Sequence, residues 1–154
     1  MTTTVRVTPV GTFLDDGFSS KIAFAADPNV SFWEKTLKPF GLDAGEPIDT
    51  TTMFNTTWRT MVLRQLKTGT SISGTCAYDP QVLDQLVALL GVNGWVTILH
   101  PNGDTWDVPA GLKSFEPPAY TEGEFPIASF ELVATMTLAG VETSPVFTNN
   151  SGTP

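Results

Sequence analysis

The fold is decided by a stretch that begins Asn55-Thr56-Thr57-Trp58-Arg59 and ends at Glu131. The order of its short signals is more informative than any single residue, and none of them has a catalytic pattern. Between its two ends lie, in order, Leu66-Lys67-Thr68-Gly69, Ser71-Ile72-Ser73-Gly74, Tyr78-Asp79-Pro80 and Pro101-Asn102-Gly103-Asp104. These signals predict a strand, then a helix, then a hairpin.

One helix is predicted from Pro80 to Leu90. Asp79 is a suitable N-cap, because its carboxylate can accept hydrogen bonds from the free amides of the first turn. Pro80 suits the first helical position, and Gly91 can end the helix in the left-handed conformation. Because so short a helix is marginal by itself, we expect its apolar stripe to pack on a sheet. The stripe consists of Val82, Leu83, Leu86, Val87 and Leu90.

Six segments have the alternation or the turn boundaries of strands. They are residues 20–25, 30–37, 71–78, 95–100, 105–112 and 125–138. The longest places Phe130 and Leu132 on one face and Glu131 on the other. Pro109 favours an edge or a bulge, because proline has no amide to donate. Residues 58–66 fit both a strand and a helical turn.

The chain is therefore predicted to be mainly β with one helix, an antiparallel β-sandwich or barrel. Its 154 residues are the length of one domain, and such a domain buries roughly 70% of its unfolded surface. We expect an N-terminal arm or edge strand at 1–19, the β-sandwich domain at 20–142 with its helix at 80–90, and a flexible C-terminal tail at 143–154.

A long connection runs from Lys38 to Phe54 without the periodicity of a helix or a strand. It contains Pro39, Gly41, Gly45 and Pro47. A connection of this length inside a compact domain is uncommon and is usually functional.

Charge is distributed unevenly along the chain. The part up to Ala77 has seven acidic and seven basic residues, whereas the part from Tyr78 onward has nine acidic residues and only Lys113. The formal net charge of −8 therefore arises in the second part. Such a surface repels phosphate, which disfavours nucleic-acid binding of the usual kind.

Several classes of protein are disfavoured by what the sequence lacks. No stretch predicts a signal peptide or a membrane span, and the lone Cys76 excludes an internal disulfide framework. No catalytic, cofactor-binding or metal-binding residues are predicted, because phosphate-binding, metal-ligand and nucleophile motifs are missing. His100 is expected to be structural or solvated. Asp104 and Asp107 would lie on opposite faces of a regular strand, which argues against an acid pair.

Taken in order, these signals resemble the major tail tube protein of long-tailed, siphovirus-like bacteriophages over residues 20–140. The resemblance rests on Trp58-Arg59 followed by Leu66-Lys67-Thr68-Gly69, on the Ser71-Ile72-Ser73-Gly74 strand, on Asp79-Pro80 with its helix, and on Pro101-Asn102-Gly103. Each signal is weak alone, and their order and spacing make the match specific.

The resemblance implies a structural virion protein that is not an enzyme and needs no cofactor. Such subunits form homohexameric rings that stack into the tail tube, the conduit for DNA ejection into the host. Phage DNA passes through it without specific binding. The expected partners are further copies of the chain, the tape measure protein and the tail terminator and baseplate proteins. Assembly in the host cytoplasm and a final place in the virion tail are expected.

Two sets of residues acquire roles from the resemblance. The expected intersubunit loop contains Pro39, Phe40, Gly41, Leu42, Asp43, Gly45, Glu46 and Pro47. An acidic lining would let a polyanion slide, whereas lysine and arginine would hold it through counterion release. The candidate luminal acids are Asp104, Asp107, Glu116, Glu122, Glu124 and Glu131, and the polar face of the longest strand favours Glu131.

Two alternatives remain open at this stage. Another tail component, a terminator or baseplate protein, would form a single ring without polymerising. A small-ligand or sugar-binding β-barrel would remain a monomer and show ligand-dependent melting. The tail tube fold also recurs in contractile tails and type VI secretion, so the fold alone does not specify the machine.

Overall fold

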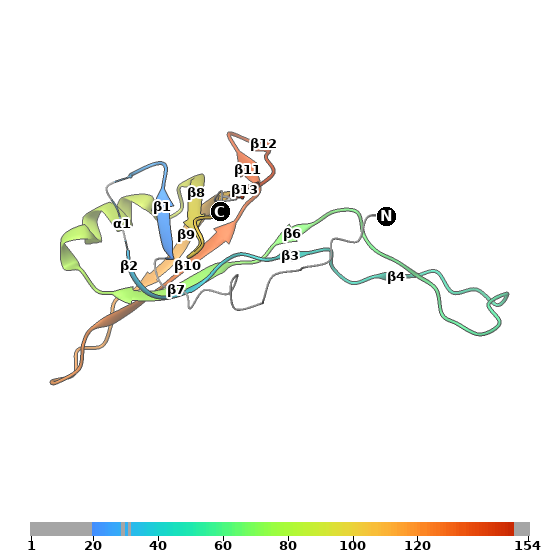
Figure 1. Cartoon of the computed structure of the whole chain (residues 1–154), viewed down its shortest axis with the longest axis horizontal. Coiled ribbons are helices and arrows are strands. Elements are labelled where there is room, and N and C mark those ends of the chain that lie inside the picture. The colour runs from blue at the N-terminus through green and yellow to red at the C-terminus, as the bar shows by residue number, and fades with distance from the viewer. Residues whose placement is uncertain (1–19, 29, 31, 150–154) are drawn as a thin grey trace.

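A curled antiparallel sheet forms the body of the molecule (Figure 1). The computed structural model describes residues 20–28, 30 and 32–149. Its main strands follow the order β1-β8-β9-β10-β7-β2, and β13 pairs with the first part of β9. Their bounds are β1 (Lys21–Phe24), β2 (Trp33–Lys38), β7 (Ile72–Ala77), β8 (Asn93–Leu99), β9 (Thr105–Glu116), β10 (Ile127–Ala134) and β13 (Val146–Thr148).

The two edges of the sheet approach each other, so the sheet forms a half-barrel. Glu34 of β2 accepts a hydrogen bond from the Ile22 amide of β1, with 2.8 Å between Oε1 and N. Phe32, which precedes β2, stacks on Phe130 of β10 and meets Phe24 of β1 edge to face. The predicted mainly β fold is thereby confirmed, as a curled sheet closed on one side by side chains.

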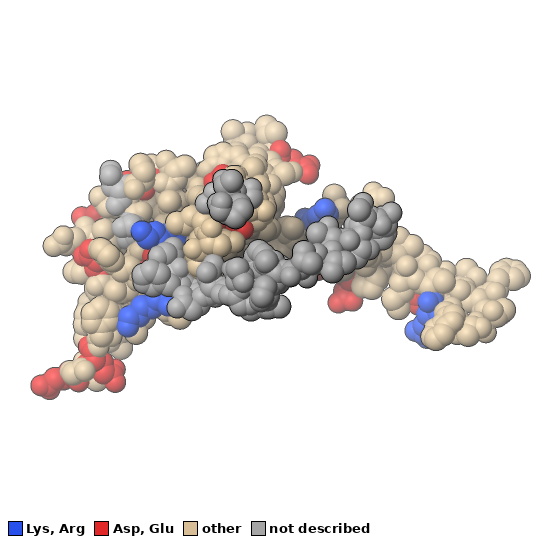
Figure 2. Space-filling model, in the orientation of Figure 1, with Lys and Arg blue, Asp and Glu red and all other residues tan. Residues whose placement is uncertain are grey.

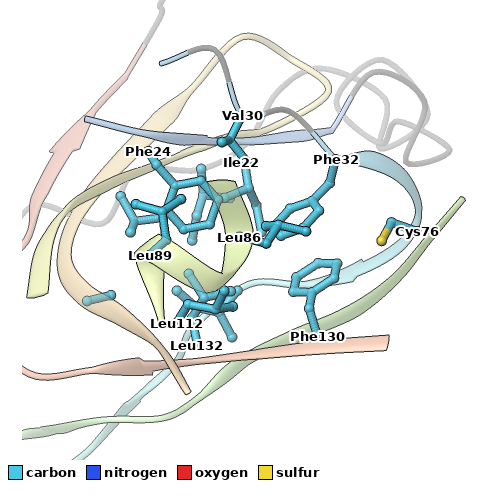
Figure 3. Packing of buried hydrophobic residues seen from close by; sticks show 14 of the residues in the cluster. Ile22, Phe24, Val30, Phe32, Cys76, Leu86, Leu89, Leu112, Phe130 and Leu132 are labelled. Atoms are coloured by element: carbon cyan, nitrogen blue, oxygen red, sulfur yellow. The ribbon is translucent and has the colours of Figure 1, made fainter. Parts of the chain in front are cut away.

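The core lies between the two ends of this curled sheet and the helix (Figure 3). Alternation places Phe130 and Leu132 of β10 in the core, as predicted, because every second side chain points to the same face. The other buried apolar residues are Ile22, Phe24, Val30, Phe32, Phe40, Ile72, Cys76, Leu86, Leu89, Val96, Ile98, Val108, Ala110, Leu112 and Ala128.

The helix begins where the sequence predicts. A 3-10 turn, η2 (Pro80–Val82), precedes α1 (Leu83–Leu89). Asp79 caps η2 by accepting from the Gln81 amide at 2.9 Å. Gly91 follows the helix with a φ of 74°, a conformation that glycine adopts without steric cost.

The predicted packing stripe of the helix is partly wrong. Leu86 is buried, but Val87 and Leu90 are 58% and 41% exposed, and Leu89 is buried in their place. The first two members of the stripe, Val82 and Leu83, are half-buried. The 3-10 turn has three residues per turn, so it rotates the following α-helical residues relative to a continuous α-helix.

The predicted strand at 125–138 is interrupted after Ala134. Met136 has a left-handed φ of 54°, and β11 (Thr137–Leu138) then pairs with β12 (Val141–Glu142). The backbone turns because the Thr135 and Met136 amides both donate to the carbonyl of Pro109, at 2.8 and 3.3 Å.

Pro109 itself is buried inside β9 rather than at an outer edge of the sheet. On the side of β10, pairing with β13 ends at Asp107 and pairing with β10 begins at Ala110. The missing proline amide therefore falls in the gap between two partner strands, where no ladder bond is lost.

The predicted hairpin at Pro101–Asp104 is confirmed. The Gly103 amide donates to the His100 carbonyl at 3.0 Å, and the His100 amide donates to the Asp104 carbonyl at 2.8 Å. Gly103 has a φ of 89°, so the turn ends in the left-handed residue that such hairpin loops require.

The segment 143–154 was expected to be a flexible tail, but its residues Val146–Thr148 form the strand β13. Residues of β13 pair with Thr105, Trp106 and Asp107 of β9. The ring of Phe147 lies 5.2 Å from that of Trp106, so an aromatic contact fastens this strand. The expected arm at 1–19, and residues 150–154, lie outside the described residues.

A long two-stranded extension continues the β2–β7 hairpin away from the body (Figure 1). We call it the hairpin arm, residues 41–70. Within it β3 (Leu42–Asp43) pairs with β6 (Thr68–Gly69), and β4 (Ile48–Asp49) pairs with β5 (Met61–Val62). Residues 58–66, whose sequence fits both a strand and a helical turn, belong to the returning strand of the hairpin arm.

Candidate assembly surfaces

Polar contacts rather than a hydrophobic core hold the hairpin arm together. At its base the Thr70 amide donates to the Gly41 carbonyl at 2.9 Å, and the Gly41 amide donates to the Thr70 hydroxyl at 2.7 Å. Towards its tip the Thr50 amide donates to the Thr60 carbonyl at 2.9 Å. The threonine-rich sequence of this region thus supplies side-chain hydrogen bonds where packing is absent.

The apolar side chains of the hairpin arm are exposed on the chain by itself. Met53, Trp58 and Leu66 are 101%, 80% and 85% exposed. Six more are also exposed, namely Leu42, Ile48, Phe54, Met61, Val62 and Leu63. Large exposed apolar surfaces of this kind mark sites of protein interaction.

The base of the hairpin arm is anchored in the body. Phe40 is buried and meets Trp106 edge to face, with 4.5 Å between the ring centroids. A Cβ on Gly69 would lie 2.5 Å from Met136 and 2.9 Å from Ala134, so the returning strand passes close to the body here. Phe40 is therefore a core residue rather than an exposed member of the predicted intersubunit loop. The other predicted members flank it, namely Pro39, Gly41, Leu42, Asp43, Gly45, Glu46 and Pro47.

A second candidate surface is the polar face of the sheet, on the side opposite the core. Its hydroxyl groups come from Ser73 and Thr75 of β7, Ser114 of β9 and Ser129 of β10. The face is hollowed into a groove of about 670 Å³. Its lining also includes Thr36, Lys38, Ser71, Glu116 and Glu131.

Two of the candidate luminal acids, Glu116 and Glu131, line this groove. Glu131 forms an ion pair with Lys113, with 3.0 Å between Oε2 and Nζ, and Lys38 adds a further cation to the lining. The polar face is therefore rich in hydroxyl groups with nearly balanced charge, rather than acidic.

The other four candidate acids lie at two distant ends of the body. Asp104 and Asp107 lie in and beside the β8–β9 hairpin, where Asp107 accepts a hydrogen bond from the Thr97 hydroxyl. Glu122 and Glu124 lie in the β9–β10 connection, at whose tip Figure 2 shows acidic surface. The structure thus does not bring the six acids together on one surface.

Reactive groups are few in the described part of the chain. Cys76 is buried, and this burial, with the nearby charge of Glu34, raises the pKa of its thiol to about 11. Residues 20–28, 30 and 32–149 contain no group of His, Cys, Asp or Glu that could hold a metal ion. No helix within these ranges is long and apolar enough to cross a membrane.

No protein-family model and no curated protein matches the sequence, whereas solved structures match the fold. A chain in the virion of a native gene transfer agent particle superposes with a TM-score of 0.64 and 14% identity, over 88% of this chain and 100% of that chain. A chain in the tail of an empty gene transfer agent particle with C6 symmetry gives a TM-score of 0.58 at 13% identity, over 84% and 94%.

A third similar chain comes from the sheath/tube terminator of an extracellular contractile injection system in its extended state. It superposes with a TM-score of 0.60 and 11% identity, over 96% of this chain and 100% of that chain. At such low identities the comparisons establish a shared fold. That fold is the one the sequence resemblance predicts.

Proposed function

We propose that this protein is the structural subunit of the tail tube of a long-tailed, phage-like particle. Copies of the chain associate into rings, and the rings stack into a conduit through which DNA is ejected. The hairpin arm carries this proposal, because it exposes apolar side chains that its own chain does not cover. It is supported by the fold shared with a chain in the tail of a gene transfer agent particle and with a chain in the sheath/tube terminator of a contractile injection system.

Rings of six copies fit the proposal, since one of the similar chains comes from a tail with C6 symmetry. Because rotation around a ring repeats the same contact, each copy would use two different surfaces toward its two neighbours. The tape measure protein and the tail terminator and baseplate proteins are the further partners. The ring would be assembled in the host cytoplasm and reside in the virion tail.

In this arrangement the polar face of the sheet lines the conduit, and α1 lies on its outer side. The helix packs on the core face, opposite the groove that carries Ser73, Thr75 and Ser129. Hydroxyl groups with few unpaired cations give DNA little to bind, because affinity for phosphate comes mainly from lysine and arginine. The pairing of Lys113 with Glu131 reduces this attraction further.

Shortening the hairpin arm tests the proposal. Residues 46–64 are replaced by a short Gly-Ser turn, which keeps the Leu42–Gly69 rung and the anchor at Phe40. We expect a folded monomer with an unchanged circular dichroism spectrum and no tubes in negative-stain microscopy, whereas the unaltered protein forms tubes. Tubes of normal length from the shortened chain would contradict the proposal.

A matched control separates length from surface chemistry. The variant Met53→Ser, Trp58→Ser, Leu66→Ser retains the full hairpin arm and removes three of its exposed apolar side chains. It should also fail to assemble, because the apolar contacts are lost rather than the reach of the arm. Assembly of this variant would show that backbone length alone is sufficient.

A ring-forming terminator is the second candidate, favoured by the likeness to a sheath/tube terminator over 96% of this chain. It would form single rings that do not stack. Negative-stain images of the unaltered protein separate the candidates, since tubes, single rings and isolated monomers are easily distinguished. Monomers at all concentrations would favour a ligand-binding β-barrel.

A further inference from the structure

The two strands of the hairpin arm carry opposite charges. The outgoing strand contains the acids Asp43, Glu46 and Asp49 and no base from Gly41 to Phe54. The returning strand contains the bases Arg59, Arg64 and Lys67 and no acid from Asn55 to Gly69. The hairpin arm therefore has no net charge, with its acidic residues on one strand and its basic residues on the other. Figure 2 shows acidic (red) and basic (blue) surface on it.

These charges are not paired within the chain. None of the six side chains has an ion-pair partner among residues 20–28, 30 and 32–149. Arg64 reaches the opposite strand through its Nε, which donates a hydrogen bond to the backbone carbonyl of Glu46 at 2.9 Å rather than to the carboxylate. Asp43 and Asp49 accept hydrogen bonds from the amides of Gly45 and Thr51 on their own strand.

Cross-strand pairing also keeps opposite charges apart. Asp43 lies opposite Thr68, and Asp49 lies opposite Met61. An arm stabilised by its own ion pairs would place acids and bases opposite one another, because directly opposed residues interact most strongly. The observed arrangement leaves one acidic side and one basic side available to other chains.

We propose that the acidic outgoing strand of each hairpin arm docks beside the basic returning strand of the arm of a neighbouring copy. This inference rests on the proposed self-assembly. In a ring the contact is head to tail, so every arm presents its acidic side to one neighbour and its basic side to the other. A single chain sequence then satisfies all contacts without any two-fold symmetric face.

The charges of the hairpin arm supply a preferred orientation, which its exposed apolar side chains do not. Apolar contacts are not directional, so Met53, Trp58 and Leu66 would pack against an arm in either orientation. Opposite charges on the two strands favour one orientation and penalise the reverse, in which like charges meet. The arm charges thereby set the direction and register in which successive copies join.

Charge reversal provides the test, with assembly scored by sedimentation and negative-stain microscopy. One variant reverses the acids (Asp43→Lys, Glu46→Lys, Asp49→Lys), and a second reverses the bases (Arg59→Glu, Arg64→Glu, Lys67→Glu). Each has an arm with two like-charged sides, and we expect each alone to lose tubes at 0.1 M salt. A third variant carries all six changes and should regain tubes, because its two sides are again opposite.

Mixing the first two variants is the decisive step. Folded monomers of each, purified separately, should form tubes when combined, since a copy with two basic sides fits between copies with two acidic sides. If the charges acted only within each hairpin arm, each variant would remain defective in the mixture. Recovery of the single variants near 1 M salt is also expected, since the screening length falls from about 10 Å to about 3 Å.

Two controls exclude general effects. The variant Asp84→Lys, Glu122→Lys, Glu124→Lys changes the net charge by the same amount at exposed residues outside the hairpin arm, and it should assemble. The variant Asp43→Asn, Glu46→Gln, Asp49→Asn keeps acceptors for the Gly45 and Thr51 amides and should weaken assembly less than charge reversal does.

The outcomes separate this inference from the proposed function. Tubes formed by the single reversals at low salt, or no tubes in the mixture, overturn the pairing of arms while the tube function stands. If the variant with all six charge reversals stays monomeric, the arm charges contact a charged site on the neighbour's body. That result also overturns the pairing of arms. Unaltered protein that never assembles overturns both.

Discussion

The β2–β7 hairpin runs from the body into the hairpin arm, and its two parts lie in opposite environments. In the body, β2 and β7 lie on the core, and Ile72 and Cys76 are completely buried. A few residues further along the same two strands, Leu42 and Leu66 are exposed. The backbone pairing is alike in both parts, so strand formation alone does not account for the difference.

The difference lies in what covers the apolar side chains. The body supplies a helix and the opposite edge of the sheet, whereas the hairpin arm has only the two strands of its own ribbon. An isolated two-stranded hairpin is marginally stable in water. In the single chain, hydrogen bonds among Thr50, Thr60 and the Asn55 turn hold the two strands of the hairpin arm together. Under the proposed function, the body would therefore provide the stability of the fold and the hairpin arm the contacts for assembly.

The largest expected contrast is between Leu132 in the body and Leu66 in the hairpin arm. Leu132 is completely buried, so Leu132→Ala should destabilise the monomer by about 2–5 kcal/mol through the cavity it leaves. Leu66 is 85% exposed, so Leu66→Ala should change monomer stability by less than about 0.5 kcal/mol while impairing assembly. Urea denaturation at concentrations below assembly measures the monomer stability of both variants. Equal destabilisation by the two substitutions would contradict the difference between the body and the hairpin arm.

A smaller contrast concerns close backbone approach in the body. A Cβ on Gly74 would lie 2.2 Å from the Thr36 carbonyl oxygen and 2.9 Å from Phe130 Cζ, because the bulge between Glu34 and Thr36 brings β2 close. Gly74→Ala should therefore cost about 1–3 kcal/mol.

Gly94 of β8 is the matched control for this substitution, since a Cβ there meets nothing within 4 Å. Gly94→Ala should leave the urea midpoint unchanged or slightly higher, because alanine restricts the unfolded chain. A Gly74→Ala protein as stable as the Gly94→Ala protein would show that β2 can move away from β7.

Much of the body could be predicted from the sequence, because its strands bury one face. Alternation in residues 125–138 placed Phe130 and Leu132 correctly in the core. The helix face was less accurate, because the 3-10 turn before Leu83 is not visible in the apolar pattern. The break at Met136 depends on a carbonyl supplied by Pro109, which is distant in sequence.

The hairpin arm was only half predicted, for the opposite reason. Periodicity indicates a strand or helix when one face is buried, but Trp58, Met61 and Leu66 have no covered face within the chain. For the outgoing half, the length of the connection and its glycine and proline content indicated a functional segment. A signal for the returning half is present in the charges, because the acids before Asn55 are followed by an equal number of bases after it.

The smallest expected effect concerns Glu34, whose carboxylate joins the two edges of the body by accepting from the Ile22 amide. Burial raises the pKa of this carboxyl above its ordinary value of 4.5, and the hydrogen bond from Ile22 and the charge of Lys21 offset the rise only in part. Because the folded state binds this proton more readily than the unfolded state, protonation favours folding. The resulting stabilisation is complete below pH 4.5 and is lost as the pH rises through the folded pKa.

Glu34→Gln removes the buried charge and keeps an oxygen that can accept from Ile22. The variant should have a higher urea midpoint than the unaltered protein at pH 7, and the difference should shrink toward zero as the pH falls below 4.5. Glu46→Gln on the hairpin arm is the control, because an exposed carboxylate bears little desolvation cost and its loss should leave the monomer unchanged at either pH. A lower stability of Glu34→Gln at pH 7 would contradict this prediction. It would mean that the ionised carboxylate stabilises the contact between β1 and β2 by more than its burial costs.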